Sequence, residues 1–153
     1  MSDTPDLAAL LDQAGRLAGI GSLVFDAQGR CMLVCHDQLA VHLAAGDDSL
    51  GLTLTAFLGP VRKGCEEAVY GQLLDANFYW QGSAGATLSL ALDPRIGVVM
   101  HKDIEIDERV DAEALAGELA GFTSAALHWQ DFLDTIDPAV NGPPPAGPAM
   151  IRV

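Results

Sequence analysis

The sequence predicts an α+β fold in which three helices pack on a twisted antiparallel sheet, in the order α-β-β-β-α-β-β-α. Three observations predict this class. Apolar residues recur at helical spacing in three segments, they alternate in shorter segments between these helices, and the connections are short. Short connections favour antiparallel pairing, with the helices largely on one side of the sheet. With 153 residues, half of them hydrophobic, the chain suits one domain with a substantial core.

The first helix is expected to begin at Thr4, whose side chain can cap it, and to end at Gly19–Gly21. Its buried face is marked by apolar residues at helical spacing: Leu7, Leu10, Leu11, Ala14, Leu17 and Ala18. Two strands are then predicted at residues 23–25 and 30–35, and the turn Asp26–Gly29 joins them.

The middle of the chain contains one ambiguous segment and two clearer ones. Residues 36–49 begin with a strand-like alternation, but Gly46–Ser49 has the composition of a turn. The third strand is predicted at residues 50–57, where alternate residues are apolar. The second helix is predicted from Gly59–Pro60 to about Asn77.

Two glycines, Gly64 and Gly71, interrupt the second predicted helix. Each costs about 0.5–1 kcal/mol relative to alanine in a helix interior. Together with Ala68 they fall at i, i+4 and i+7, which would place a stripe of very small residues on one helix face. Such a stripe allows close approach of another element, either the sheet of the same molecule or a second subunit.

Residues 73–100 join a helix end, a glycine-rich elbow and a two-stranded hairpin. Helical spacing ends at Asn77, and a run of small residues follows at 82–86. Residues 87–92 alternate as a strand. Asp93–Gly97 then predicts a turn, because proline presets φ and glycine supplies an unusual backbone angle, so the chain returns as the partner strand.

This block resembles the class I type III secretion chaperones of the CesT-like (Tir chaperone) family, in which a Leu-x-x-Ala-Asn helix end leads through a Gly-Ala-Thr-Leu segment into a hairpin. The matching residues are Leu73, Ala76, Asn77, Gln81, Gly82, Gly85, Ala86, Thr87, Leu88 and the turn Asp93–Gly97. The size, the acidity and the order of elements over about residues 4–135 also fit. The resemblance implies a homodimeric chaperone that binds the N-terminal segment of one or a few secreted effector proteins and keeps it export-competent without ATP.

The third helix has the most regular apolar pattern in the chain. Its expected buried face repeats at i, i+4, i+7, i+11, i+14 and i+18: Leu115, Leu119, Phe122, Ala126, Trp129 and Leu133. After it, the sequence becomes rich in Pro and Gly with little to bury. We therefore expect one domain over residues 1–136 and a disordered tail over residues 137–153.

The charge of the chain argues against two classes of partner. Its formal net charge is −13, from 21 acidic and 8 basic residues. This balance repels nucleic acid and anionic membranes, and no uninterrupted apolar run is long enough for membrane insertion. The N-terminus carries acidic residues where a secretory signal needs basic ones, so a cytoplasmic, bacterial location is expected.

No cluster of residues predicts catalysis, metal binding or a cofactor. On a strand at 30–35, the sulfurs of Cys31 and Cys35 would lie about 13 Å apart at ~3.3 Å per residue, so buried apolar thiols are favoured over metal ligands. The four histidines lie in different elements without a zinc spacing. The expectation is therefore a protein that is not an enzyme and that has no cofactor.

Several predicted strands are apolar at consecutive positions, which suggests that both of their faces need cover. Three helices can cover one face, so the other face must meet a subunit, the tail or a partner polypeptide, unless residues 36–49 fold over it. The candidate effector-binding residues are Phe25, Met32, Val34 and Leu54, with Leu10 and Leu17 as additions from the first helix.

The resemblance also implies that the second helix and the strand after it form a two-fold dimer interface. The candidate dimer residues are Val61, Gly64, Ala68, Gly71, Tyr79 and Trp80. The alternative function is a small α+β ligand-sensing or regulatory domain with an apolar pocket between sheet and helices.

Overall fold

A computed structural model describes residues 6–47 and 50–138 of the chain. The helices are α1 (Leu7–Leu17), α2 (Glu66–Asn77), the short 3₁₀ helix η1 (Phe78–Trp80) and α3 (Ala112–Thr135). The strands are β1 (Arg30–Cys35), β2 (Leu39–Ala45), β3 (Gly51–Gly59), β4 (Thr87–Leu90) and β5 (Val98–Glu105). The predicted order of three helices and five strands is confirmed.

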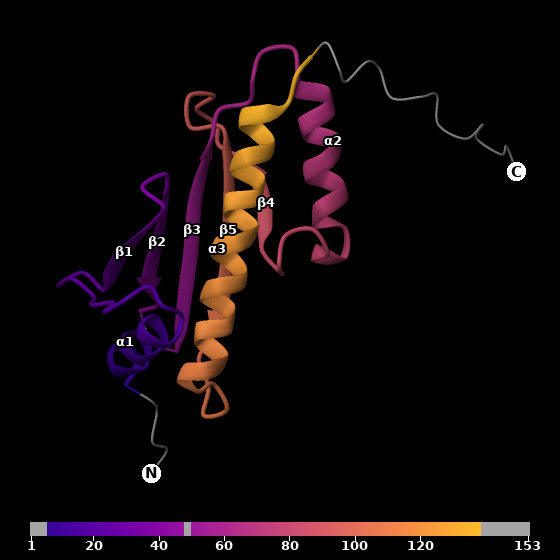
Figure 1. Cartoon of the computed structure of the whole chain (residues 1–153). Coiled ribbons are helices and arrows are strands. Elements are labelled where there is room, and N and C mark those ends of the chain that lie inside the picture. The colour runs from indigo at the N-terminus through magenta and orange to yellow at the C-terminus, as the bar shows by residue number, and fades with distance from the viewer. Residues whose placement is uncertain (1–5, 48–49, 139–153) are drawn as a thin grey trace, which may run out of the picture.

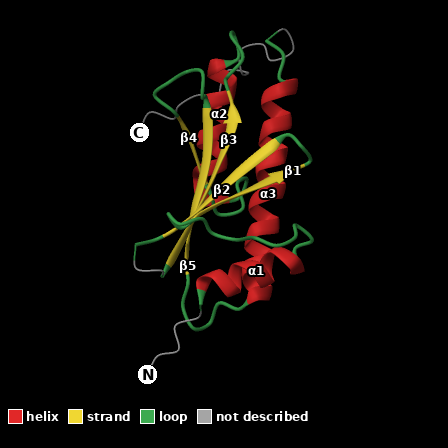
Figure 2. Cartoon of the chain, turned by 90° about the vertical axis from the view of Figure 1, so that its left-hand side faces the viewer, coloured by secondary structure: helices red, strands yellow, loops and turns green. Residues whose placement is uncertain are grey.

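The five strands form one antiparallel sheet in the order β1-β2-β3-β5-β4. Helix α3 runs across one face of this sheet and packs against α1, and α2 lies beside β4 (Figures 1 and 2). The edge strands are therefore β1 and β4, and β4 is the edge that lies next to a helix.

The core lies between α3 and the sheet. Along β3, residues facing the helices are buried and residues facing the other way are not, which is the alternation expected of a strand with one covered face. The predicted face of α3 is confirmed as core, because all six of its residues are at most 6% exposed. Phe122 and Leu115 are among the largest fully buried side chains.

The first part of the sheet differs from the prediction. Residues 23–25 form no strand, and the ambiguous segment contains β2 instead. Leu23 is buried because it packs against Gly15 of α1, where a Cβ would lie only 2.8 Å from Leu23 Cγ. The tight turn between β1 and β2 places His36 and Asp37 at positive φ, a conformation that these residue types tolerate but do not signal.

The two helix starts also differ from the prediction. Asp6, not Thr4, caps α1, since its carboxylate accepts a hydrogen bond from the Ala8 N–H at 3.1 Å; Thr4 lies outside the described residues. Helix α2 begins at Glu66 and not at Pro60. Gly64 precedes the helix at φ +89° and packs against Pro138, so it does not continue the stripe of Ala68 and Gly71.

The elbow between α2 and β4 is held by polar contacts that explain its residue types. The Asn77 side chain donates to the Leu88 carbonyl at 2.8 Å and accepts from the Leu88 N–H at 2.9 Å, so it pairs with β4 as a strand residue would. The buried Ser83 hydroxyl donates to the Ala86 carbonyl at 2.6 Å. Trp129 of α3 donates its indole N–H to the Gly82 carbonyl at 2.9 Å. These bonds give the elbow one conformation.

We expect replacement of Asn77 by alanine to reduce the free energy of unfolding by about 1–3 kcal/mol, because it leaves two backbone groups of Leu88 without partners in a partly buried site. Chemical denaturation at fixed protein concentration measures this loss. Asn77→Asp should also be destabilised, because it keeps the acceptor for the Leu88 N–H but sets a carboxylate oxygen against the Leu88 carbonyl. Equal stability of Asn77→Ala and the unmodified protein would contradict this account.

The predicted tail, residues 137–153, lies outside the described residues except for Asp137 and Pro138. Its start is anchored. The Arg62 guanidinium donates to the carbonyls of Ile136 at 3.0 Å and Asp134 at 2.6 Å, which ties the end of α3 to the loop before α2.

Candidate protein-binding surfaces

The sheet face that points away from α3 carries exposed apolar side chains. Met32 and Val34 of β1 are 58% and 56% exposed, and Phe57 of β3 is 48% exposed. The strand register places Met32 opposite His42, and the His42 ring meets the Phe57 ring edge-on at 5.5 Å. These residues form what we call the open sheet face: Met32, Val34, His42 and Phe57. Large side chains left in water in this way indicate an interaction surface.

Strand β1 is an edge strand, and Asp26 occupies the outward backbone groups of its first residue, Arg30. The Arg30 carbonyl accepts the Asp26 N–H at 2.7 Å, so it points away from β2. Alternate residues of an antiparallel strand direct their backbone groups to the same side, so Met32 and Val34 also point theirs outward. Within residues 6–47 and 50–138, no backbone group pairs with them. Such an edge is a template for another strand.

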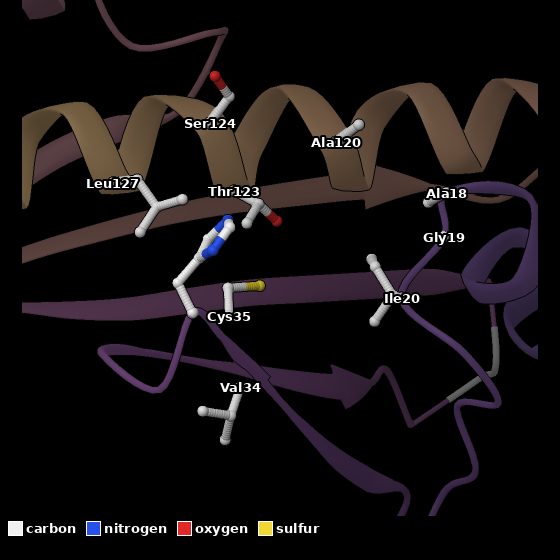
Figure 3. Close-up of a pocket in the computed structure, with 10 residues that line it drawn as sticks. Ala18, Gly19, Ile20, Val34, Cys35, Ala120, Thr123, Ser124 and Leu127 are labelled. Atoms are coloured by element: carbon white, nitrogen blue, oxygen red, sulfur yellow. The ribbon is translucent and has the colours of Figure 1, made fainter.

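Two pockets lie along the β1 edge. The first, of about 490 Å³, involves the second half of β1 with α3 and the loop after α1. Figure 3 shows Cys35, Thr123 and Leu127 around it, with Ile20 on the other side. Burial raises the pKa of the Cys35 thiol, so this thiol stays uncharged at neutral pH. The second pocket, of about 570 Å³, involves the first half of β1 with residues 22–24.

The predicted effector-binding residues divide into three groups. Met32, Val34 and Leu17 are on the surface, and Leu17 is 63% exposed. Phe25 is half-buried against the core. Leu10 and Leu54 are core residues, at 8% and 0% exposure, and so present no surface to a partner.

Two exposed apolar residues were not among the predicted ones: Phe57, and Val24, which is 71% exposed and lines the second pocket. Phe57 could have been found, because it continues the outward-facing alternation of Gly51, Thr53 and Thr55. Val24 belongs to the run of consecutive apolar residues 23–25, which was predicted as a strand but is irregular in the structure.

A second apolar surface is formed by α2, η1 and β4, which pack together. We call it the α2 surface; its exposed members are Tyr70, Leu74, Phe78, Tyr79, Trp80 and Leu90. Leu74 is 72% exposed and Tyr79 is 74% exposed. The backbone of Tyr79 and Trp80 has positive φ, at 56° and 51°. Such strain is uncommon for aromatic residues, and here it accompanies the display of their rings.

The predicted dimer residues only partly coincide with this surface. Tyr79 and Trp80 belong to it. Ala68 and Val61 are half-buried against the core, and Gly71 is exposed with nothing within 4 Å of a Cβ position. The larger contributors, Leu74 and Phe78, were missed, although with Tyr70 they recur at i, i+4 and i+8 in the sequence.

The described part of the chain offers neither a metal site nor a membrane-spanning helix. No three His, Cys, Asp or Glu side chains of residues 6–47 and 50–138 gather closely enough to hold a metal ion. Across the same residues, every helix is too short or too polar to cross a membrane.

Comparison with known proteins identifies the family. The profile of the Tir chaperone protein (CesT) family matches residues 9–130, and a comparison with curated protein sequences gives no significant match. One similar solved chain comes from the ExsC–ExsE complex: it is 24% identical with a TM-score of 0.64, over 87% of this chain and 97% of that one. Another comes from the HopA1–SchA chaperone–effector complex, at 23% identity and a TM-score of 0.61, over 80% and 91%.

A third comes from the Yersinia pestis type III secretion chaperone SycH in complex with a fragment of YscM2, at 17% identity and a TM-score of 0.61, over 80% of this chain and 98% of that one. At these identities the solved structures demonstrate a shared fold. The family profile, in contrast, covers most of the sequence. The chain therefore belongs to the Tir chaperone (CesT) family.

Proposed function

We propose that this protein is a cytoplasmic, homodimeric type III secretion chaperone that binds the N-terminal segment of one or a few effector proteins without ATP. The observation that carries the proposal is the open β1 edge, which has a pocket at each half and the open sheet face beside it. Membership of a chaperone family supports it, as does the fold shared with chains from chaperone–effector complexes.

The two edges of the sheet differ in a way that selects β1 as the cargo site. The Asn77 side chain occupies both backbone groups of Leu88, so β4 is blocked in its middle. The outward backbone groups of Met32 and Val34 have no such partner among the described residues. An extended cargo segment would therefore pair with β1 and place alternate side chains in the two pockets and over the open sheet face.

The α2 surface is the proposed dimer interface. It is rich in aromatic side chains, which are enriched at protein interfaces, and it lies at the opposite edge of the sheet from β1. A two-fold dimer through this surface would leave both β1 edges free, one in each subunit. Each dimer would then offer two equivalent sets of cargo contacts.

The alternative of a ligand-sensing domain has less support. It requires an apolar cavity between the sheet and the helices. The space between α3 and the middle of the sheet is filled instead by side chains at most 1% exposed, among them Leu54, Leu119 and Phe122, and the pocket between β1 and α3 lies at the sheet edge.

The proposal is tested by capturing the cargo and then altering one backbone group. The tagged protein is purified from its bacterium under secretion-inducing conditions, and the N-terminal fragment of any secreted protein recovered is titrated calorimetrically. We expect Val34→Pro to weaken binding roughly tenfold or more, because proline removes the outward N–H but leaves the ladder with β2 intact. Val34→Thr, which keeps the N–H and the shape, should bind with nearly unchanged affinity.

Two results would count against the proposal. One is recovery of no secreted protein although candidate effectors are expressed. The other is equal affinity of Val34→Pro and Val34→Thr, which would exclude strand pairing at β1.

A further inference from the structure

A third pocket, of about 320 Å³, lies between α2 and α3, and we call it the α2–α3 pocket. Its walls are the aromatic rings of Phe78, Trp129 and Phe132. Trp129 and Phe132 meet edge-on with ring centroids 5.5 Å apart, and the bond from Trp129 to the Gly82 carbonyl fixes the indole. Since β1 contributes nothing to its lining, the pocket is separate from the proposed cargo site.

The rim of this pocket is polar and contains an acid. Its members are Gln72, Asp75, Gln81 and His128. No ion pair of Asp75 is formed within residues 6–47 and 50–138, and no Lys or Arg of those residues lines the pocket. Aromatic faces beside an unpaired carboxylate are the surroundings that a guanidinium group favours, because they combine cation–π attraction with charged hydrogen bonds.

The chain itself contains a basic side chain that is within reach of this pocket. Arg152 is the only charged residue of the segment 139–153, and the apolar Met150 and Ile151 precede it. Of the eight Lys and Arg residues in the sequence, it is the only one beyond Arg109. The segment therefore has the charge and the apolar character that complement an acidic, aromatic pocket.

The starting point of this segment makes the approach possible. Pro138 packs against Gly64 just before α2, with its ring carbons 3.5–3.6 Å from a Cβ position on that glycine. The pocket lies toward the other end of α2, and a helix of 12 residues is roughly 18 Å long. The stretch from Pro138 to Arg152 can span up to roughly 45 Å when extended. The length is more than sufficient.

We propose that residues 149–153 of the same chain dock in the α2–α3 pocket, with the Arg152 guanidinium between the aromatic walls and the Asp75 carboxylate. The docked segment would form an ion pair with Asp75 and would cover Trp129 and Phe132. It would also exclude basic segments of other proteins from a pocket that suits them, and so restrict cargo binding to the β1 edge.

Disulfide trapping tests the proposal. Cys31 and Cys35 are replaced by serine, while Cys65, which is 2% exposed, is retained. Ile151→Cys is then combined with Gln72→Cys at the pocket rim, and the rate of intramolecular crosslinking is followed under mild oxidant. The matched control is Glu67→Cys, which is exposed on α2 and lies nearer to Pro138. A tail that samples space at random would favour position 67.

We expect position 72 to crosslink at least about tenfold faster than position 67, at a rate independent of protein concentration. Arg152→Glu should remove this preference, and Asp75→Arg added to Arg152→Glu should restore it. Equal rates at the two positions, or a preference unaffected by Arg152→Glu, would overturn the proposal. A rate that rises in proportion to protein concentration, or a product that migrates as two linked chains on a non-reducing gel, would also overturn it, since the tail of a second molecule or of the dimer partner would then be the occupant. No cargo is needed, so the result is independent of the chaperone proposal.

Discussion

Replacing Leu74 with glutamate is expected to convert the proposed dimer into a monomer. Leu74 is 72% exposed on the α2 surface, one helical turn after the exposed Tyr70. Burying a leucine contributes about 1.5–3 kcal/mol, and a two-fold interface contains each residue twice. Loss of both leucines therefore weakens the dimer by about 3–6 kcal/mol, or roughly 10²–10⁴-fold. Two buried, unpaired carboxylates add to this effect.

Sedimentation or light scattering at micromolar concentration measures the outcome, which should be the mass of one 16.0 kDa chain. The helix itself should be unaffected, because leucine and glutamate have similar helix propensities. Leu17→Glu is the matched control: it alters an exposed leucine on α1, outside the α2 surface, and should leave the dimer intact. If the Leu74→Glu protein is still a dimer, the α2 surface is not the dimer interface.

Replacing Gly97 with alanine is expected to lower the free energy of unfolding by about 3 kcal/mol or more. Gly97 is buried at φ +75°, and a Cβ there would lie less than 3.0 Å from both the Gly59 carbonyl oxygen and Pro60 Cα. Both obstacles are backbone atoms, so they cannot rotate away. The end of the β4–β5 hairpin would have to separate from the end of β3.

Thermal unfolding at fixed protein concentration should show the loss as a decrease of roughly 6–12 °C in Tm. Gly59→Ala is the control, because Gly59 also has positive φ, at 113°, but nothing lies within 4 Å of its Cβ position. Gly59→Ala should lower the free energy of unfolding by only about 1–3 kcal/mol, which is the cost of holding an alanine at positive φ. Similar losses for the two variants would show that the close contact at Gly97 is relieved at little cost.

Much of the fold was predictable because it depends on local patterns. The face of α3 follows from helical spacing alone, and the hairpin around Asp93–Gly97 follows from turn chemistry. The region of β2 was not assigned, because the turn before it uses His36 and Asp37 at positive φ, where a sequence reader expects Asn or Gly. The start of α2 was placed too early, since Pro60 resembles a helix start but the chain makes a further turn before Glu66.

The candidate surfaces were predictable only in part. Consecutive apolar residues at 31–35 correctly indicated that β1 has apolar side chains on both faces, and Met32 and Val34 lie on the exposed one. The same reasoning placed Leu54 at the surface, because the alternation of a strand identifies two faces without identifying the covered one. Phe78 was missed because its exposure depends on the strained elbow that follows it.

The sequence by itself determined the types and order of the elements, the apolar face of α3 and the family resemblance, because all of these depend on spacing along the chain. Only the tertiary structure decided that Val24 is exposed, that the β4 edge is blocked by Asn77, and that the outward backbone groups of Met32 and Val34 have no backbone partner among residues 6–47 and 50–138. The physical reason is that burial and pairing depend on which segments, distant in sequence, come to lie on each face and edge of the sheet.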